Sequence, residues 1–147
     1  MARVDLGDLD TVGGANKGFE VELYQPATNE DLGIFITVLG RDSDTFQKIA
    51  KQQNKRRIDK MSKSGFRAGK VTAPSQEEID ADNLDMLTAC SMSWRTIDGD
   101  EELDTVLFEG EELTFSIGAA KKLYSARPWI KEQIDVAIGD RANFIKA

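Results

Sequence analysis

Basic and acidic side chains are segregated along this chain, and the segregation restricts which segments can lie inside a core. Residues 41–73 carry ten basic and three acidic side chains, whereas residues 74–118 carry one basic and thirteen acidic side chains. Charged side chains are almost never fully buried unless they are paired. Each block therefore predicts either a solvated helix face or a surface that meets a charged partner, including the opposite block of another copy.

The composition of the 147 residues argues against most catalytic and metal sites. The chain has no histidine, which removes Ser-His and Cys-His nucleophile pairs and every histidine-liganded metal. Its single cysteine, Cys90, cannot form an internal disulfide or a zinc site with two or four cysteine ligands. We therefore expect a protein that is not an enzyme and that holds no cofactor and no metal.

Hydropathy and cysteine usage bear on the cellular compartment. No segment approaches the ~20 consecutive apolar residues of a membrane-spanning helix. The first residues lack the apolar core of a signal peptide. The lack of a disulfide framework is typical of a reducing compartment. We expect an intracellular protein that does not enter a membrane.

A β-hairpin is predicted near the start of the chain. Residues 19–25 alternate apolar and polar side chains, and residues 32–39 are rich in β-branched residues. Residues 26–31, between these runs, contain the Pro, Asn and Asp that favour turns. The pattern predicts two antiparallel strands. The inward-facing side chains of the first strand would be Phe19, Val21 and Leu23.

The rest of the chain has mainly helical patterns. A basic helix is expected after the capping residues 42–44, and it is polar on all sides over residues 51–57. Ser75 and Glu78 have the spacing of a capping box, which predicts the start of another helix. Pro128 is typical of the first position of a helix and predicts the last one.

The predicted fold class is α+β, with a small N-terminal antiparallel β-hairpin followed by a mostly helical body. Two short segments, residues 94–97 and 106–108, interrupt the helical patterns and are strand-like or buried. We expect residues 1–18 to form a flexible N-terminal arm. Residues 19–147 are expected to form one domain with a flexible linker near residues 62–74.

Two segments approximate known ligand-binding loops without meeting their requirements. Residues 64–71 have the length of a phosphate-binding loop, but Ser64 and Val71 replace the required glycine and hydroxyl residues. Residues 98–109 place five carboxylates at the spacing of a calcium-binding EF-hand loop. Leu103 occupies the position that needs glycine for the sharp turn. Neither nucleotide nor calcium binding is predicted.

An apolar cluster in the C-terminal part is one candidate for partner binding. Such a stripe at helical spacing is typical of a helix face that reaches its own core, and also of an interface. If the protein is a binding protein, the sequence predicts that an apolar patch contacts the partner through Trp129, Ile130, Ile134 and Phe144.

A basic cluster is the second candidate. Lys55, Arg56 and Arg57 would steer the chain towards an acidic partner or towards the acidic block of another copy, so self-association is expected. The same cations would suit nucleic-acid phosphates, but the overall acidity of the chain opposes nucleic-acid binding.

The order of several motifs resembles the small tail assembly chaperones, or minor tail-assembly proteins, of long-tailed bacteriophages. The resemblance covers nearly the whole chain from about residue 19 onward. It is carried by Pro26-Ala27-Thr28, residues 36–43, Lys55-Arg56-Arg57, Trp94 before Asp98-Gly99, Phe115-Ser116, Leu123-Tyr124, residues 128–134 and residues 140–144.

This resemblance implies a non-enzymatic role in the cytoplasm of a bacterial host. Such proteins bind the helical tape measure protein while the tail tube polymerises around it, and they are usually absent from the finished particle. In some phages an extended form also recruits tail tube subunits. The sequence leaves two alternatives: a structural virion component, such as a tail completion or minor tail protein, and a nucleic-acid-binding accessory protein.

Overall fold

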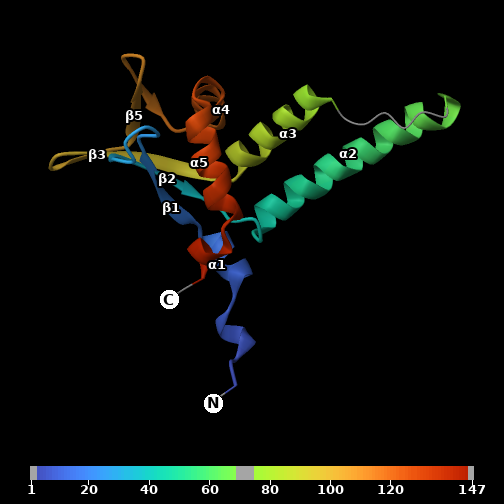
Figure 1. The fold of residues 1–147 in the computed structure, drawn as a ribbon, viewed down its shortest axis with the longest axis horizontal. Helices are drawn as coiled ribbons and strands as arrows, with labels where there is room; N and C mark the ends of the chain where they lie inside the picture. Colours follow the sequence, from blue (N-terminus) through green and yellow to red (C-terminus); the bar gives the residue numbers. More distant parts are fainter. Residues whose placement is uncertain (1–2, 69–74, 146–147) are drawn as a thin grey trace.

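The computed structural model describes residues 3–68 and 75–145, which form an α+β fold (Figure 1). The elements, in chain order, are η1 (Leu6–Asp8), α1 (Thr11–Lys17), β1 (Phe19–Tyr24), β2 (Asp31–Val38), α2 (Asp44–Ala68), α3 (Gln76–Ala89), β3 (Ser91–Asp98), β4 (Glu101–Leu103), β5 (Thr105–Phe108), β6 (Glu111–Thr114), α4 (Ile117–Ala126), α5 (Pro128–Gly139) and η2 (Arg141–Phe144).

A four-stranded antiparallel sheet with the order β1-β2-β3-β4 lies at the centre of the fold. The predicted hairpin is present as β1 and β2, in which Val21 lies opposite Ile36. On the other side of β2, Ile36 lies opposite Trp94 of β3. These three side chains are buried because alternate residues of a strand point to the same face of the sheet.

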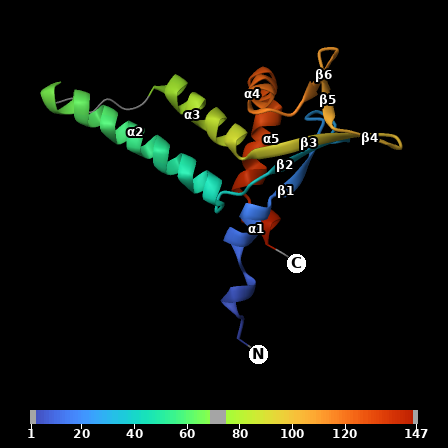
Figure 2. The same cartoon turned by 180° about the vertical axis from the view of Figure 1, so that it is seen from behind.

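Helices cover that apolar face of the sheet. α5 crosses the sheet, with α4 and α3 beside it (Figures 1 and 2). Ile134 of α5 and Leu123 of α4 are almost completely buried among these layers. The opposite face carries polar groups, with the Arg95 guanidinium 4.4 Å from the centre of the Phe35 ring. One covered and one polar face is the usual arrangement for an antiparallel sheet.

The β5–β6 hairpin closes one end of the core. Trp94 Nε1 donates a hydrogen bond to the Leu113 carbonyl oxygen at 3.0 Å. The Trp94 ring also meets the Phe115 ring edge to face, with centroids 5.1 Å apart. This hairpin therefore satisfies the indole N–H that burial of Trp94 would otherwise leave unpaired.

The two ends of the described chain pack together. α1 lies against η2, and a Cβ atom on Gly14 would be 1.5 Å from the Phe144 carbonyl oxygen. Only glycine permits this approach. The Gly40 amide donates to the Ala15 carbonyl at 3.1 Å, which joins α1 to the segment that enters α2.

α2 is the feature that departs from a compact shape. Its 25 residues span about 37 Å at the rise of an α-helix. It starts next to α1 and projects beyond the sheet and the other helices, as both views show (Figures 1 and 2). Ser43 caps it, because its Oγ accepts a hydrogen bond from the Phe46 amide at 3.1 Å.

The structure corrects the predicted order of elements at the start of the chain. Helix α1 lies within residues 1–18, where the sequence predicted a flexible arm, and it precedes the hairpin. Asp10 caps α1 by accepting a hydrogen bond from the Gly13 amide at 2.9 Å. α1 is short and contains Gly13, Gly14 and Ala15, so its sequence shows no amphipathic period.

The expected linker and helical body also differ from the structure. Residues 62–68 continue α2 as helix, since each residue added to an existing helix gains a hydrogen bond. Residues 69–74, the rest of the predicted linker, lie outside the described residues. The body is helical over most of its length, but β3 and β4 extend the hairpin into a four-stranded sheet, and β5 and β6 form a separate two-stranded sheet. Pairing with β2 overrides the weak strand propensity of Ser91 and Ser93.

Candidate functional site

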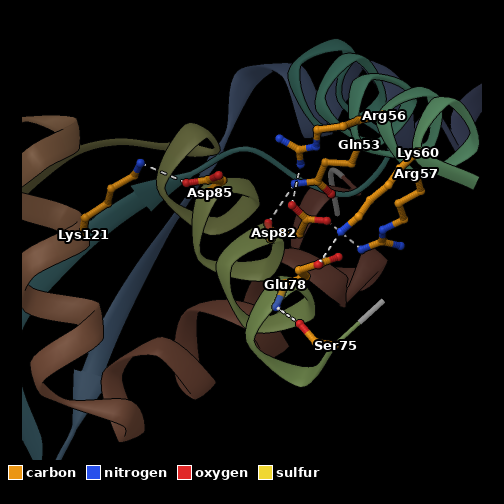
Figure 3. A network of polar contacts seen from close by, with 9 residues as sticks. All are labelled: Gln53, Arg56, Arg57, Lys60, Ser75, Glu78, Asp82, Asp85 and Lys121. Atoms are coloured by element: carbon orange, nitrogen blue, oxygen red, sulfur yellow. Dashed lines mark hydrogen bonds and ion pairs between the residues drawn. The ribbon is translucent and has the colours of Figure 1, made fainter. Parts of the chain in front are cut away.

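Ion pairs between α2 and α3 hold the basic block against the acidic block. Arg56 Nη2 lies 2.5 Å from Asp82 Oδ1, and Arg57 Nη2 lies 2.8 Å from Asp82 Oδ2 (Figure 3). One turn further along α2, Lys60 Nζ lies 2.6 Å from Glu78 Oε1. We call these five residues the α2–α3 clasp.

The centre of the clasp is nearly inaccessible to solvent. The Asp82 side chain is 11% exposed, and Gln53 Nε2 donates to the Asp82 carbonyl oxygen at 2.8 Å. The Ser75 cap predicted from the sequence begins α3 here, because the Glu78 amide donates to Ser75 Oγ at 3.2 Å (Figure 3). A carboxylate this buried is stable only with its partners in place. The clasp therefore holds the second half of α2 against α3.

The structure separates the three predicted basic residues. Arg56 and Arg57 bind Asp82 within the chain rather than remaining free for a partner. Lys55 lies on the other side of α2 and is exposed. No acidic side chain of residues 3–68 and 75–145 forms an ion pair with it. Arg56, Arg57 and Lys60 of the basic block are thus paired with the acidic block inside the molecule.

The base of α2 has its own anchor. Arg141 Nε lies 2.7 Å from Asp42 Oδ2, and Arg141 Nη2 lies 3.0 Å from Asp42 Oδ1. The hydrogen bond from Arg141, followed by one from Thr11, lowers the pKa of Asp42 to about 2. The carboxylate is therefore charged at neutral pH and ties η2 to the start of α2.

The predicted apolar patch lies mostly in the core. Ile130, Ile134 and Phe144 are buried, and Ile134 is 0% exposed. Their helical spacing is that of a core face, because α5 and η2 point these side chains at the sheet and at α1. Of the four predicted residues, only Trp129 reaches the surface, where it is half-buried.

Trp129 lines a surface cavity of about 230 Å³ between the β1–β2 turn and α5. Tyr24 and Val136 line the same cavity, and Val136 is 66% exposed. Gln133 holds the two sides together, since its side chain accepts from the Tyr24 amide at 3.1 Å and donates to the Tyr24 carbonyl at 2.9 Å. We call Tyr24, Trp129 and Val136 the α5 groove.

The groove could not be found from the sequence alone. Tyr24 is the last residue of β1, and Val136 lies near the end of the chain. Val136 also falls on the exposed side of α5, which periodicity assigns to solvent. Pro26 in the turn was the only local signal, since it marks the end of the strand that carries Tyr24.

A second cavity, of about 250 Å³, lies between α3, α4 and α5 and includes Tyr124. Burial raises the pKa of Tyr124 to about 12, and its hydroxyl lies 2.7 Å from Ser91 Oγ. Burial also raises the pKa of the Cys90 thiol to about 11. Both groups are therefore protonated at neutral pH and contribute packing rather than a nucleophile.

The acidic residues 98–109 do not form a calcium-binding loop. They lie along the end of β3, on β4 and on β5, joined by tight turns. In the part of the chain that the structure describes, no group of three Cys, Asp or Glu side chains is placed to hold a metal ion. No helix within the same residues has the length and apolar character needed to cross a membrane.

Comparison of the chain with protein families, curated proteins and solved structures finds no match. The resemblance to tail assembly chaperones therefore rests on the ordered motifs. The function has to be inferred from those motifs together with the α5 groove and the exposed side of α2.

Proposed function

We propose that this chain is a non-enzymatic tail assembly chaperone that binds the tape measure protein of a long-tailed bacteriophage in the host cytoplasm. The ordered motifs support the family. The α5 groove is the observation that supports binding of an apolar helix. A chaperone has to cover apolar helical surface reversibly, which requires an exposed apolar site on a charged and soluble exterior.

The shape and lining of the groove suit a protein side chain better than a metabolite. Its volume of about 230 Å³ lies below the ~300–1,000 Å³ of small-molecule pockets. Tyr24 and Trp129 supply aromatic surface of the kind enriched at the centres of interfaces. Glu132 and Asn29 lie at the same cavity and supply a polar rim.

The charges of the chain support a smaller role in binding. Because Arg56 and Arg57 are engaged by Asp82, Lys55 is the member of the predicted basic cluster that is free to attract an acidic partner. The same engagement weakens the alternative of nucleic-acid binding, which would use all three cations.

Co-expression with the tape measure protein tests this function. Val136→Glu places a charge in the groove at a site that is already 66% exposed, so the fold should tolerate it. Ile117→Glu, on the exposed start of α4, is the matched control. We expect the tape measure protein to co-purify with the wild type and the control, and about tenfold less with Val136→Glu, a loss of ~1.4 kcal/mol.

Absence of the tape measure protein from the wild-type pull-down at low and moderate salt would contradict the proposal. The alternative of a structural virion component is distinguished by mass spectrometry of purified particles. Stoichiometric presence of the chain in the mature virion would favour a tail completion or minor tail protein.

A further inference from the structure

The residues before α1 and in its first turn expose a row of apolar side chains. Val4 and Leu6 are 73% and 77% exposed, and Leu9 and Val12 are also exposed. This N-terminal segment, residues 3–12, extends away from the sheet in both views (Figures 1 and 2). Clustered apolar side chains on a projecting segment indicate a contact with another molecule.

The backbone hydrogen bonds of residues 3–10 are local, whereas Thr11, near the end of the segment, is hydrogen-bonded to Asp42. The Leu9 amide donates to the Leu6 carbonyl at 3.1 Å, and the Gly7 amide donates to Asp5 Oδ1 at 2.9 Å. These turns hold the segment in shape without attaching its apolar side chains to the body. The segment also carries three acidic residues, Asp5, Asp8 and Asp10, against one basic residue.

A complementary surface lies on the side of α2 that faces away from α3. Lys48, Lys51 and Lys55 fall within an arc of about 60° on the helix, and Ile58 continues the same face. All four are exposed. Among the described residues, no ion pair involves these three lysines, in contrast to the cations of the clasp. We call these four residues the α2 outer face.

We propose that the N-terminal segment of one copy binds the α2 outer face of a second copy. The charges are opposite, and Leu6 and Leu9 can pack against Ile58 and the aliphatic stems of the lysines. Within one copy the segment points away from α2 (Figures 1 and 2). Each copy carries one segment and one face, so a two-fold exchange satisfies both and closes as a dimer.

The acidic β4 and β5–β6 region of a second copy is a weaker occupant for the α2 outer face. Three of its carboxylates already have basic neighbours: Glu102 lies near Arg95, Glu109 near Arg127 and Glu111 near Lys122. The N-terminal segment combines acidic residues with exposed leucines, and this combination matches lysines next to Ile58.

Light scattering of the full chain at ~100 µM and low salt tests the dimer. We expect a dimer for the wild type and for Leu107→Asp, a control at another exposed leucine. Leu6→Asp combined with Leu9→Asp should give a monomer with an unchanged thermal midpoint, because both leucines are exposed and outside the core. A monomeric wild type, or a double variant that stays dimeric, would overturn the proposal.

A charge exchange tests the pairing itself. One variant carries Lys51→Glu and Lys55→Glu, and the other carries Asp5→Lys and Asp8→Lys. Each variant alone places like charges together and should be monomeric. Mixing them restores opposite charges at both contacts, so a heterodimer should form and should dissociate in ~0.5 M salt.

A mixture that remains monomeric would refute the exchange. So would formation of a heterodimer between the Lys51→Glu and Lys55→Glu variant and a Glu101→Lys and Glu112→Lys variant, because that result would assign the α2 outer face to the acidic hairpins. The ion pairs of the clasp are unchanged in every variant.

Discussion

Asp42 shows how one side chain links distant parts of this chain. It joins the start of α2 to Arg141 of η2 through two hydrogen bonds, and these favour its charged form. The pKa of Asp42 in the folded chain is therefore about 2, below its usual value of 3.8. The folded state holds this proton less tightly than the unfolded state, so the carboxylate stabilises the fold above pH ~4.

This contribution should be lost as the pH falls from about 4 to about 2. Asp42→Asn should therefore lower the free energy of unfolding at pH 6. Between pH ~4 and pH ~2, the free energy of unfolding should fall less in this variant than in the wild type. Thermal unfolding followed by circular dichroism between pH 6 and pH 2 measures the effect. Asp100→Asn, in the exposed turn between β3 and β4, is the control. If the stability of Asp42→Asn declined below pH ~4 as steeply as that of the wild type, the ion pair would not stabilise the fold.

Gly14 is a second residue whose role follows from close packing. A Cβ atom there would overlap the backbone oxygen of Phe144, which cannot rotate away. Gly14→Ala should therefore destabilise the chain by about 1–3 kcal/mol in spite of the better helix propensity of alanine. Gly139→Ala, where no atom lies within 4 Å, should be nearly neutral. Urea unfolding of both variants measures the difference in stability. Equal midpoints for Gly14→Ala and Gly139→Ala would contradict the close contact between Gly14 and Phe144.

At the scale of elements, α2 has two different attachments. Its first turns pack Phe46 and Ile49 against the core, whereas residues 53–60 are held by the polar contacts of the clasp. Polar attachment depends on single partners, while apolar packing is shared among many contacts. The two halves of α2 should therefore respond differently to one substitution in α3.

Asp82→Ala should loosen the second half of α2 and leave the first half in place. We expect lower hydrogen-exchange protection over residues 53–60 and little change near Phe46. The cost in global stability should be about 1–2 kcal/mol, less than for a fully buried pair, because Arg56 and Arg57 are partly exposed. Asp85→Ala, which removes an exposed pair with Lys121, should change neither. If Asp82→Ala changed hydrogen-exchange protection equally in both halves of α2, the two halves would not be attached in different ways.

At the scale of the whole molecule, one core joins the sheet to α3, α4 and α5, and Cys90 lies inside it. The thiol is 0% exposed and burial raises its pKa to about 11. A reagent can reach it only when that core opens. The accessibility of Cys90 thus reports on the unfolding of the molecule as a unit.

Cys90 should react slowly with a thiol reagent at pH 8 in the absence of denaturant, and rapidly above the urea midpoint. Met92→Cys adds a thiol at an exposed neighbouring position, so it should produce one additional fast phase. A fast reaction of the wild type in buffer would show that the core opens locally around β3 and α3.

Local patterns carried the sequence predictions that the structure confirms. The alternation of residues 19–25, the Ser75 cap and the position of Pro128 each depend on neighbours a few residues away, and each marks an element that is present. The strands β4 and β6 are short and polar, so they have no such pattern. They exist because β3 and β5 pair with them.

The candidate sites were less predictable for the same reason. Trp129 and Lys55, which the sequence proposed for binding, do reach the surface, but the sequence could not separate Ile134 from a surface residue or place Tyr24 beside Val136.

By itself, the sequence determined the α+β composition, the hairpin, the helix starts and the two opposite charge blocks. Only the tertiary structure decided how those blocks are used: Asp82 takes Arg56 and Arg57, and Lys55 is left facing outward. The physical reason is the distance along the sequence over which each interaction acts. Periodicity and capping act within a turn or a strand, whereas ion pairs and burial depend on which segments the fold brings together.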